Sequence, residues 1–387
     1  MQQNQLTDKI YYIGVDDKEI DLFEGQYVVP HGISYNSYVI MDEKIAIMDT
    51  VDVHKANEWL LNLKEVLGQK EPNYLVVLHM EPDHAGSIEK LVQAYPSIQL
   101  VSNQKAFQMM EQFFPNLDLE GRKVIVKEGD NLSLGEHTLS FVSAPMVHWP
   151  EVMVAYERKE KILFSADAFG KFGALDTFEE WDCEARRYYI NIVGKYGAPV
   201  QTLLKKAMTL DIQKIFPLHG PMLVDNLSYY INKYDIWSSY KAEDKGVFIA
   251  YTSIYGHTKE VALKLRDILL QKGVQKVAIA DLARDDMAEC VEDAFRYSHL
   301  VLASPTYDGD VFPYMATFIH HLKSKNYQNR TVGLIENGSW APMAAQVMKK
   351  ELTTFKDIHL IDKHVTIKSA LKEGDISALN ELADSLL

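Results

Sequence analysis

The regular alternation of strand-like and helical segments after residue 245 limits most strongly what this chain can fold into. Five short runs of apolar residues recur there, and helical patterns such as residues 256–273 follow several of them. The strand-like runs are residues 246–253, 276–282, 300–307, 331–339 and 359–370. Strands that alternate with helices are typical of a doubly wound parallel sheet, because parallel neighbours need a crossover connection. We therefore predict a doubly wound α/β domain at residues 246–387.

The region before residue 245 has more closely spaced strands. A hairpin is predicted at residues 37–50, a helix at 53–68 and a strand at 74–79. Further short strands are expected at residues 98–103, 123–129, 137–144, 152–157 and 161–167. Such a mixture favours a layered αβ sandwich. Because the polar segment 238–246 suits a linker, the 387 residues are predicted to form two domains, 1–245 and 246–387.

Charge and composition narrow the class of function. Forty basic against 54 acidic residues give a formal charge of −14, which opposes non-specific nucleic-acid binding. No apolar stretch approaches the roughly 20 residues that a membrane helix needs, and the polar N-terminus does not resemble a signal peptide. Cys183 and Cys290 are far apart and form neither a disulfide framework nor a CxxC pair. We expect a cytoplasmic protein without nucleic-acid or membrane partners.

Three loops follow strands of the predicted C-terminal sheet, where doubly wound domains bind ligands. Loop 252–258 has small and hydroxyl residues before a helix, which suits a phosphate. It lacks the lysine of a Walker A loop, so a nucleoside triphosphate is not expected. The other two loops carry Tyr307 and Trp340, which can stack on a flat ring. The three loops resemble those of flavodoxins and predict bound FMN. Helix capping by Thr252, Ser253, Thr258 or Ser339 is the alternative.

The predicted FMN contacts are the residues of these three loops. They are Thr252, Ser253, Ile254, Tyr255, Gly256, His257, Thr258, Ser304, Pro305, Thr306, Tyr307, Asp308, Gly309, Asn337, Gly338, Ser339 and Trp340.

The run HMEPDH, which begins at His79, places two imidazoles and two carboxylates within six positions after an apolar strand. His79 and Glu81 are two residues apart, so on an extended strand end their side chains point the same way. The chain must turn after the proline, which lets Asp83 and His84 reach the same pocket from a helix start. Mixed imidazole and carboxylate ligands suit borderline divalent metals, and iron is favoured for redox chemistry. Alternatively, Asp83 simply caps a helix.

Further candidate ligands recur after strand-like runs. His148 lies in SAPMVHWP, Asp167 in LFSADAFG and His219 in IFPLHGP. Histidines without such a setting, such as His137 before a strand or His320 and His321 on an amphipathic helix, are expected to be structural or solvated. Recurrence in this setting favours a metal site over a helix cap.

Taken in order, the seven candidates resemble the metallo-β-lactamase fold, whose pattern is HxHxDH, a later His, an Asp and a last His. Glu81 stands where a zinc hydrolase has histidine, and a carboxylate there makes a harder, more anionic site that favours iron. The HxExDH form joined to a flavodoxin-like domain resembles the flavodiiron proteins, or A-type flavoproteins. The resemblance covers essentially the whole chain. It implies a metallo-β-lactamase-like αβ/βα sandwich followed by a flavodoxin-like doubly wound sheet.

The same resemblance implies a non-haem diiron centre with two irons per chain. Its ligands would be His79, Glu81 and His148 for one iron, Asp83, His84 and His219 for the other, and Asp167 as the bridge. His31 and Tyr196 are candidate catalytic residues beside the open iron positions. Trp149 and Trp340 are candidates for shielding the two cofactors.

The resemblance also implies an electron route from an external donor through FMN and the irons to O2, reduced to water, or to NO, reduced to N2O. The donor is expected to be a separate rubredoxin-like protein or another reductase, because the chain has no CxxC pair. A head-to-tail homodimer, or a dimer of such dimers, is expected to bring one chain's FMN beside the partner's irons.

Two other functions remain open on the sequence. One is a zinc hydrolase with an accessory flavodoxin domain, which Glu81 disfavours. The other is an electron carrier in which FMN works and the N-terminal half is a scaffold. The complete set of seven ionisable ligands disfavours the carrier.

Overall fold

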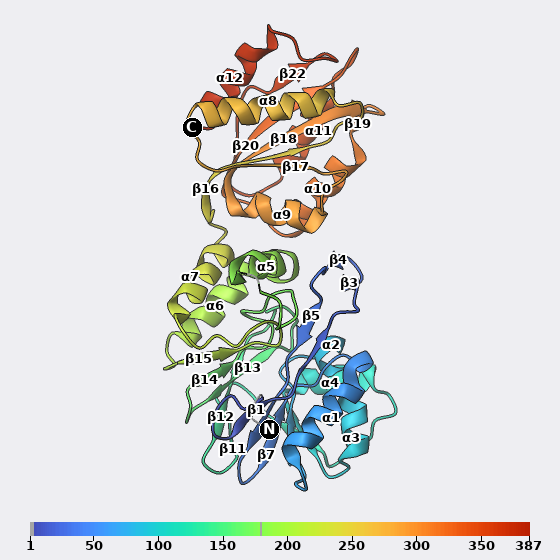
Figure 1. Ribbon diagram of the computed structural model, residues 1–387, viewed down its shortest axis with the longest axis vertical. Helices are drawn as coiled ribbons and strands as arrows, with labels where there is room; N and C mark the ends of the chain where they lie inside the picture. Colours follow the sequence, from blue (N-terminus) through green and yellow to red (C-terminus); the bar gives the residue numbers. More distant parts are fainter. Residues whose placement is uncertain (1–3, 179) are drawn as a thin grey trace. The chain divides into compact units, whose positions relative to one another are not determined.

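The computed structural model describes residues 4–178 and 180–387 and divides the chain into two compact units (Figure 1). Residues 1–189 and 198–235 form the first unit, and residues 190–197 and 236–387 form the second. The connection between α7 (Leu227–Ser238) and β16 (Asp244–Tyr251) lies within the expected linker. The domain boundary expected after residue 245 falls inside β16, and it stays a prediction.

Two mixed β-sheets form the centre of the first unit. One has six strands in the order β1-β6-β7-β8-β9-β10, and the other has five in the order β11-β12-β13-β14-β15. The strands of the first sheet are β1 (Ile10–Tyr12), β6 (Tyr38–Met41), β7 (Ile45–Met48), β8 (Tyr74–Val76), β9 (Gln99–Ser102) and β10 (Lys123–Ile125). Those of the second are β11 (Asn131–Ser133), β12 (Thr138–Ser143), β13 (Met153–Glu157), β14 (Ile162–Phe164) and β15 (Lys214–Phe216). The predicted hairpin is the antiparallel pair β6 and β7.

Helices cover the two sheets from outside (Figure 1). Those drawn beside the first sheet are α1 (Ala56–Leu67), α3 (Ile88–Ala94) and α4 (Gln104–Phe113), and α6 (Gly197–Ala207) and α7 lie on the opposite side of the pair of sheets. Every residue of β7 and β8 is buried, as expected for strands covered on both faces. The first unit is therefore the predicted αβ/βα sandwich.

The second unit contains a doubly wound sheet with the strand order β17-β16-β18-β20-β21. Its strands β17 (Val277–Asp281), β18 (Tyr297–Tyr307), β20 (Arg330–Asn337) and β21 (Ile358–Leu360) pair in parallel with their neighbours. β17 and β18 follow one another in the sequence but lie on opposite sides of β16. The chain therefore reverses its winding between β16 and β18, which is where such sheets bind ligands. The fold class predicted from the alternation is confirmed.

Apolar side chains explain why the helices of the second unit pack on this sheet. α8 (His257–Gln271) buries Val261, Leu265 and Ile268, and α12 (Asp375–Ser385) buries Leu379 and Leu382. These residues belong to one core cluster with the buried face of the sheet. Their three- and four-residue spacing places them on one helical face, and burial of that face stabilises the layer.

Two details of the second unit differ from the sequence expectation. Residues 359–370 do not form one strand, because β21 and β22 (Val365–Ile367) are separate strands that pair with the two ends of β20. A helix, α9 (Met287–Arg296), joins β17 to β18 where no helix was expected. Asp286 caps α9 by accepting a hydrogen bond from Glu289 N, and this capping signal stands next to many charged residues that obscure the apolar period.

The helices α10 (Pro313–Ser324) and α11 (Ala344–Leu352) complete the helical layers on the sheet of the second unit. Among the described residues, no helix combines the length and the apolar character that crossing a bilayer demands.

Candidate metal centre and ligand pocket

The turn after β8 brings the first four candidate ligands together. The ladder of the sheet ends at Val76, earlier than predicted, and Leu78 N and His79 N instead donate to the Asp49 carboxylate at 2.7 and 3.3 Å. Asp49 stands immediately after β7, so one buried carboxylate ties the backbone of this turn to the end of the neighbouring strand. The short helix α2 (Pro82–Ala85) then begins with a proline at its first turn, where no backbone donor is needed.

The first group of candidate ligands consists of His79, Glu81, His148 and Asp167. One ligand atom from each lies within 4.8 Å of the others, and all four residues are buried. Oε2 of Glu81 is 3.2 Å from Nε2 of His79 and 2.9 Å from Nε2 of His148. Oδ2 of Asp167 is 3.1 Å from the same nitrogen of His148. Two imidazoles and two carboxylates thus converge on one point.

The second group consists of Asp83, His84 and His219. Oδ2 of Asp83 lies 3.3 Å from Nε2 of His84 and 3.1 Å from Nε2 of His219. The other oxygen of Asp167, Oδ1, lies 3.0 Å from Nε2 of His84 and 3.9 Å from Nε2 of His219. Asp167 therefore faces the first group with one oxygen and the second group with the other.

The outer nitrogens of two histidines are held by groups that can only accept hydrogen bonds. Nδ1 of His79 is 2.8 Å from the Glu151 carboxylate, and Nδ1 of His219 is 2.7 Å from the carbonyl of Ser34. Each Nδ1 must therefore carry the hydrogen, which leaves the lone pair of Nε2 pointing at the candidate centre. Neither Glu151 nor Ser34 was predicted from the sequence, because nothing local marks a residue 72 or 185 positions away as a partner.

Electrostatics within the cluster favour the charged form of both partners. Burial alone would lower the pKa of His148, but its contacts with Asp167 and Glu81 raise the pKa to about 9. Burial would raise the pKa of Glu81, yet hydrogen bonds from His148 and His79 lower it. The carboxylates therefore demand compensating positive charge, which protons on the imidazoles or metal cations supply.

Unpartnered buried atoms test whether this centre fits metal ions. Both oxygens of Asp83, Nε2 of His84, Oδ1 of Asp167 and Nε2 of His219 are buried without a hydrogen-bond partner. Buried polar atoms in folded proteins nearly always have a partner. These atoms converge with mixed nitrogen and oxygen chemistry, which suits two borderline divalent cations such as iron. The residues fit the implied diiron group.

Aromatic rings enclose the same atoms. Trp149 lies 5.3 Å from His79, and Phe23 and Tyr188 each lie 5.5 Å from His219, between ring centroids. Tyr188, at the end of α5 (Trp181–Tyr188), is fully buried and its hydroxyl has no hydrogen-bond partner. Trp149 therefore lies beside the candidate centre, and its shielding role stays a prediction.

The two predicted catalytic residues have different surroundings. His31 lies just before β5 (Ile33–Tyr35), and its carbonyl accepts a hydrogen bond from Ala174 N. Tyr196 belongs to the second unit, whereas all seven candidate ligands belong to the first. The catalytic roles of both stay predictions. The sequence reasoning missed Tyr188, because a tyrosine pair followed by another tyrosine in one segment does not reveal which ring turns inward.

A cavity of about 590 Å³ lies in the second unit at the loops after β16, β18 and β20. Most of the predicted FMN contacts line it, together with three residues that were not predicted. The predicted ones are Ser253, Ile254, Tyr255, His257, Thr258, Pro305, Thr306, Asp308, Gly309, Asn337, Gly338, Ser339 and Trp340. The additional ones are Ala341, Met343 and Ser369, of which Ser369 N donates to the Asn337 side chain at 3.0 Å.

The remaining predicted contacts have other recorded partners. Thr252 and Ser304 are buried and joined by a hydrogen bond of 3.2 Å between their hydroxyls, which links the first and second loops. Gly256 has a φ of 96° before α8, and its N–H donates to the Ser253 hydroxyl. Tyr307 is partly exposed and contacts Phe312. Their assignment as FMN contacts stays a prediction.

The cavity fits a flat ring that carries a phosphate. Tyr255 and Trp340 are 89% and 92% exposed, which is unusual for large aromatic side chains unless something covers them. The N-terminus of α8, a helix of 15 residues, starts beside the same cavity and favours an anion. The residues therefore fit FMN.

Known proteins are similar to this chain in both of its units. A family model described as "ODP family beta lactamase" matches residues 33–220. A nitric oxide reductase of Moorella thermoacetica is 29% identical, and the match covers 97% of this chain and 96% of that protein.

Two solved structures superpose over nearly the whole chain. The rubredoxin oxygen:oxidoreductase of Desulfovibrio gigas has a TM-score of 0.91 at 26% identity and covers 99% of this chain and 97% of its own. The flavodiiron protein of Giardia intestinalis has a TM-score of 0.91 at 25% identity and covers 100% of this chain and 97% of its own. By its fold, its length and its ordered set of histidines and carboxylates, the chain belongs to the flavodiiron proteins.

Proposed function

We propose that the protein reduces O2 to water, NO to N2O, or both, at two irons held in the first unit, with electrons that arrive through FMN in the second. The observation that carries the proposal is the position of Asp167, whose two oxygens face two separate groups of histidine and carboxylate ligands. Relatives that are named as a nitric oxide reductase and a rubredoxin-oxygen oxidoreductase support it.

In this proposal each group of side chains holds one iron. The ligands are His79, Glu81 and His148 for the first iron and Asp83, His84 and His219 for the second, with Asp167 as the bridge. When bound, two ferrous irons and a reduced FMN would together supply the four electrons that convert one O2 and four protons into two waters. Reduction of two NO and two protons to N2O and water needs two electrons.

The chain's own residues orient the ligands and place aromatic rings against the imidazoles of His79 and His219. Glu151 and the Ser34 carbonyl hold the imidazoles of His79 and His219 in one tautomer and orientation. The aromatic rings around them keep the local dielectric low, which strengthens the electrostatic interactions between ligands and cations. Glu81 adds a negative charge to the site, which favours the binding of iron over the binding of zinc.

Tyr188 is the buried hydroxyl that can donate a hydrogen bond toward a group held at the centre. Burial, together with the charges of Asp167, Glu81 and Asp83, raises the pKa of Tyr188 well above its usual value, so the phenol keeps its proton at neutral pH. We include Tyr188 in the proposal as a hydrogen-bond donor. His31 and Tyr196 remain candidates from the sequence.

FMN is proposed to occupy the cavity of the second unit. Loop 252–258 and the N-terminus of α8 would hold the phosphate, and Tyr255 and Trp340 would flank the ring. A separate rubredoxin-like protein is proposed as the donor, and a head-to-tail homodimer or a dimer of such dimers, in the cytoplasm, as the working form.

The test is anaerobic purification of the full chain with iron, zinc and FMN quantification, followed by O2 and NO electrode assays with a reduced rubredoxin. We expect about two irons and one FMN per chain and consumption of at least one gas. Zinc at full occupancy after growth in iron-rich medium would support the hydrolase instead. FMN reduction without gas consumption would support the electron carrier.

A further inference from the structure

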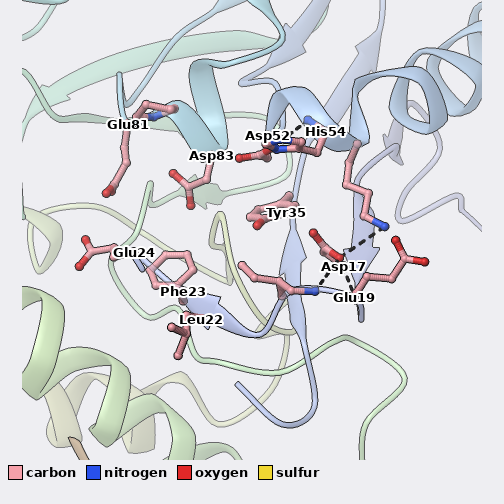
Figure 2. Close-up of a pocket in the computed structure, with 13 residues that line it drawn as sticks. Asp17, Glu19, Leu22, Phe23, Glu24, Tyr35, Asp52, His54, Glu81 and Asp83 are labelled. Atoms are coloured by element: carbon pink, nitrogen blue, oxygen red, sulfur yellow. Dashed lines mark hydrogen bonds and ion pairs between the residues drawn. The ribbon is translucent and has the colours of Figure 1, made fainter. Parts of the chain in front are cut away.

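A cavity of about 530 Å³ opens beside the candidate metal centre (Figure 2). Six carboxylates line it, and among the described residues that form its wall the basic ones are His54 and Lys55. The carboxylates are Asp17, Glu19, Glu24, Asp52, Glu81 and Asp83. Figure 2 shows them around one open space, with Asp17 and Glu19 on one side and Glu81 and Asp83 on another.

Glu24 is exposed, and four of the other carboxylates range from exposed to nearly buried. Glu19 is exposed to solvent, and the side chains of Asp52 and Asp17 are 23% and 12% exposed. The side chain of Asp83 is 10% exposed, and that of His219, which lies 3.1 Å from Asp83, is fully buried. The cavity therefore connects solvent with the second group of candidate ligands.

The carboxylate of Asp83, at the inner end of the cavity, lacks hydrogen-bond partners. Asp83 is 8% exposed as a residue, and neither of its oxygens accepts a hydrogen bond. Such atoms are rare in protein interiors and are accounted for when a cation completes their coordination. Asp83 and Glu81 both line the cavity and belong to the second and the first ligand group, so they are the proposed ligands that an ion entering through this cavity reaches.

The outer carboxylates are held in place by local contacts that leave the cavity negative. Oδ1 of Asp17 accepts hydrogen bonds from Glu19 N and Ile20 N and lies 3.4 Å from Nζ of Lys55. Oδ1 of Asp52 accepts a hydrogen bond from His54 N. The six carboxylates outnumber the two basic side chains, Lys55 and His54, of which His54 has its Nδ1 2.7 Å from Oδ1 of Asp52. A recess with low-dielectric walls focuses the field of such an excess of acidic groups.

We propose that this cavity is the entry path by which ferrous iron reaches the diiron ligands, with Asp17, Glu19 and Asp52 steering the ion toward Asp83. Oxygen ligands suit a hydrated divalent cation that is still exchanging its water, and nitrogen ligands follow at the buried end. The proposal rests on the diiron function above and adds the route and the residues that control the rate of metal loading.

Metal-free protein mixed anaerobically with ferrous ammonium sulfate tests the path. The rate of iron uptake is measured at low ionic strength by trapping unbound iron with a chromogenic chelator, and iron per chain is measured at equilibrium. The double variant Glu19→Gln/Asp52→Asn should load about three- to tenfold more slowly, which is part of the roughly 10- to 1,000-fold by which a whole charged recess changes association rates. Its final iron content should equal that of the wild type. The difference should disappear in about 1 M salt, where the Debye length is about 3 Å.

A second acidic hollow on the first unit provides the matched control. It has a volume of about 490 Å³ and is lined by Glu111, Asp118 and Glu120 together with Lys123. Asp118→Asn/Glu120→Gln removes the same charge there and should load at the wild-type rate. The exposed single change Glu19→Lys should slow loading in the same direction as the double variant.

The outcomes separate the two proposals. Wild-type protein that holds no iron at equilibrium overturns the diiron function and the entry path with it. Normal iron content with equal uptake rates in wild type and the cavity variants overturns the entry path alone. Equal slowing by the control variant means that overall charge acts instead of this cavity, and it also overturns the path.

Discussion

Glu151 accepts a hydrogen bond of 2.8 Å from Nδ1 of His79, and both side chains are completely buried. The same oxygen of Glu151 accepts a second hydrogen bond from Met80 N at 2.9 Å. One carboxylate thus fixes both the imidazole and the backbone that carries it. This relationship leads to the first prediction.

Glu151→Gln should weaken iron binding by about tenfold, because mutation of the hydrogen-bond partner of a metal-bound histidine typically lowers metal affinity by about 10- to 100-fold. The amide oxygen still accepts a hydrogen bond, but it lacks the charge that makes the imidazole a stronger ligand. Iron affinity is measured by chelator competition. Glu157→Gln is the control, since the Glu157 carboxylate is equally buried and accepts hydrogen bonds from Lys159 N and Glu160 N. Equal iron affinity in wild type and Glu151→Gln contradicts the prediction.

Asp167→Ala should lose most of the iron while FMN stays bound. The aspartate faces both ligand groups, so its removal takes one ligand from each proposed iron and leaves four buried histidine neighbours without a shared partner. Metal analysis and flavin absorbance on one preparation measure both effects. Retention of two irons per chain would show that another residue bridges.

Glu81→His should raise the zinc-to-iron ratio in protein expressed with both metals. The change removes one negative charge from the centre and recreates the zinc hydrolase pattern, so the site becomes softer and stabilises ferric iron less well. Gas reduction should fall sharply, and FMN content should stay near that of the wild type, because the flavin cavity belongs to the other unit. Unchanged iron loading together with unchanged turnover means that Glu81 is not a ligand.

Tyr188→Phe should reduce turnover by about tenfold or more, because a hydrogen bond to a charged group contributes about 1.5–3 kcal/mol. The substitution removes one hydroxyl without changing the packing of the ring against Phe172 and His219. Iron and FMN content should not change. Tyr196→Phe, made in parallel, tests the residue expected from the sequence. A loss of turnover in Tyr196→Phe but not in Tyr188→Phe would reverse the assignment.

Asp42→Asn should destabilise the first unit by about 1–3 kcal/mol at neutral pH, the usual cost of weakening hydrogen bonds to a buried charged group. Asp42 accepts hydrogen bonds from His137 N at 2.7 Å and from Lys9 Nζ at 3.0 Å, and lies 2.9 Å from Nδ1 of His137. Burial would raise the pKa of Asp42, but these donors lower it overall. Its stabilising contribution is therefore complete above the unfolded pKa of about 3.9 and is lost as the pH falls further.

Urea unfolding of wild type and Asp42→Asn, followed at pH 7 and again near pH 3, measures this effect. The difference in free energy of unfolding should be largest at pH 7 and smaller at the lower pH. A difference that does not change with pH would mean that packing, and not the charge of Asp42, stabilises this part of the sandwich.

Several features of the protein were determined by local sequence alone. The alternation of strands and helices after residue 245 predicted the doubly wound sheet, because periodicity and turn residues act within windows of a few residues. The spacing in HMEPDH, with three later residues after strand ends, predicted which seven side chains would gather. The expected strand at 359–370 failed, since two separate strands meet the two ends of β20 there.

Other features depend on contacts between distant segments, which only the tertiary structure decides. Asp49 holds the backbone of His79 across 30 positions, Glu151 holds its ring across 72, and Ser34 holds His219 across 185. None has a local signature, because a buried carboxylate or a carbonyl acquires its partner from packing rather than from its neighbours in sequence. The inward turn of Tyr188 and the closure of acidic side chains around one cavity have the same origin: side-chain direction and burial are set when the layers pack together.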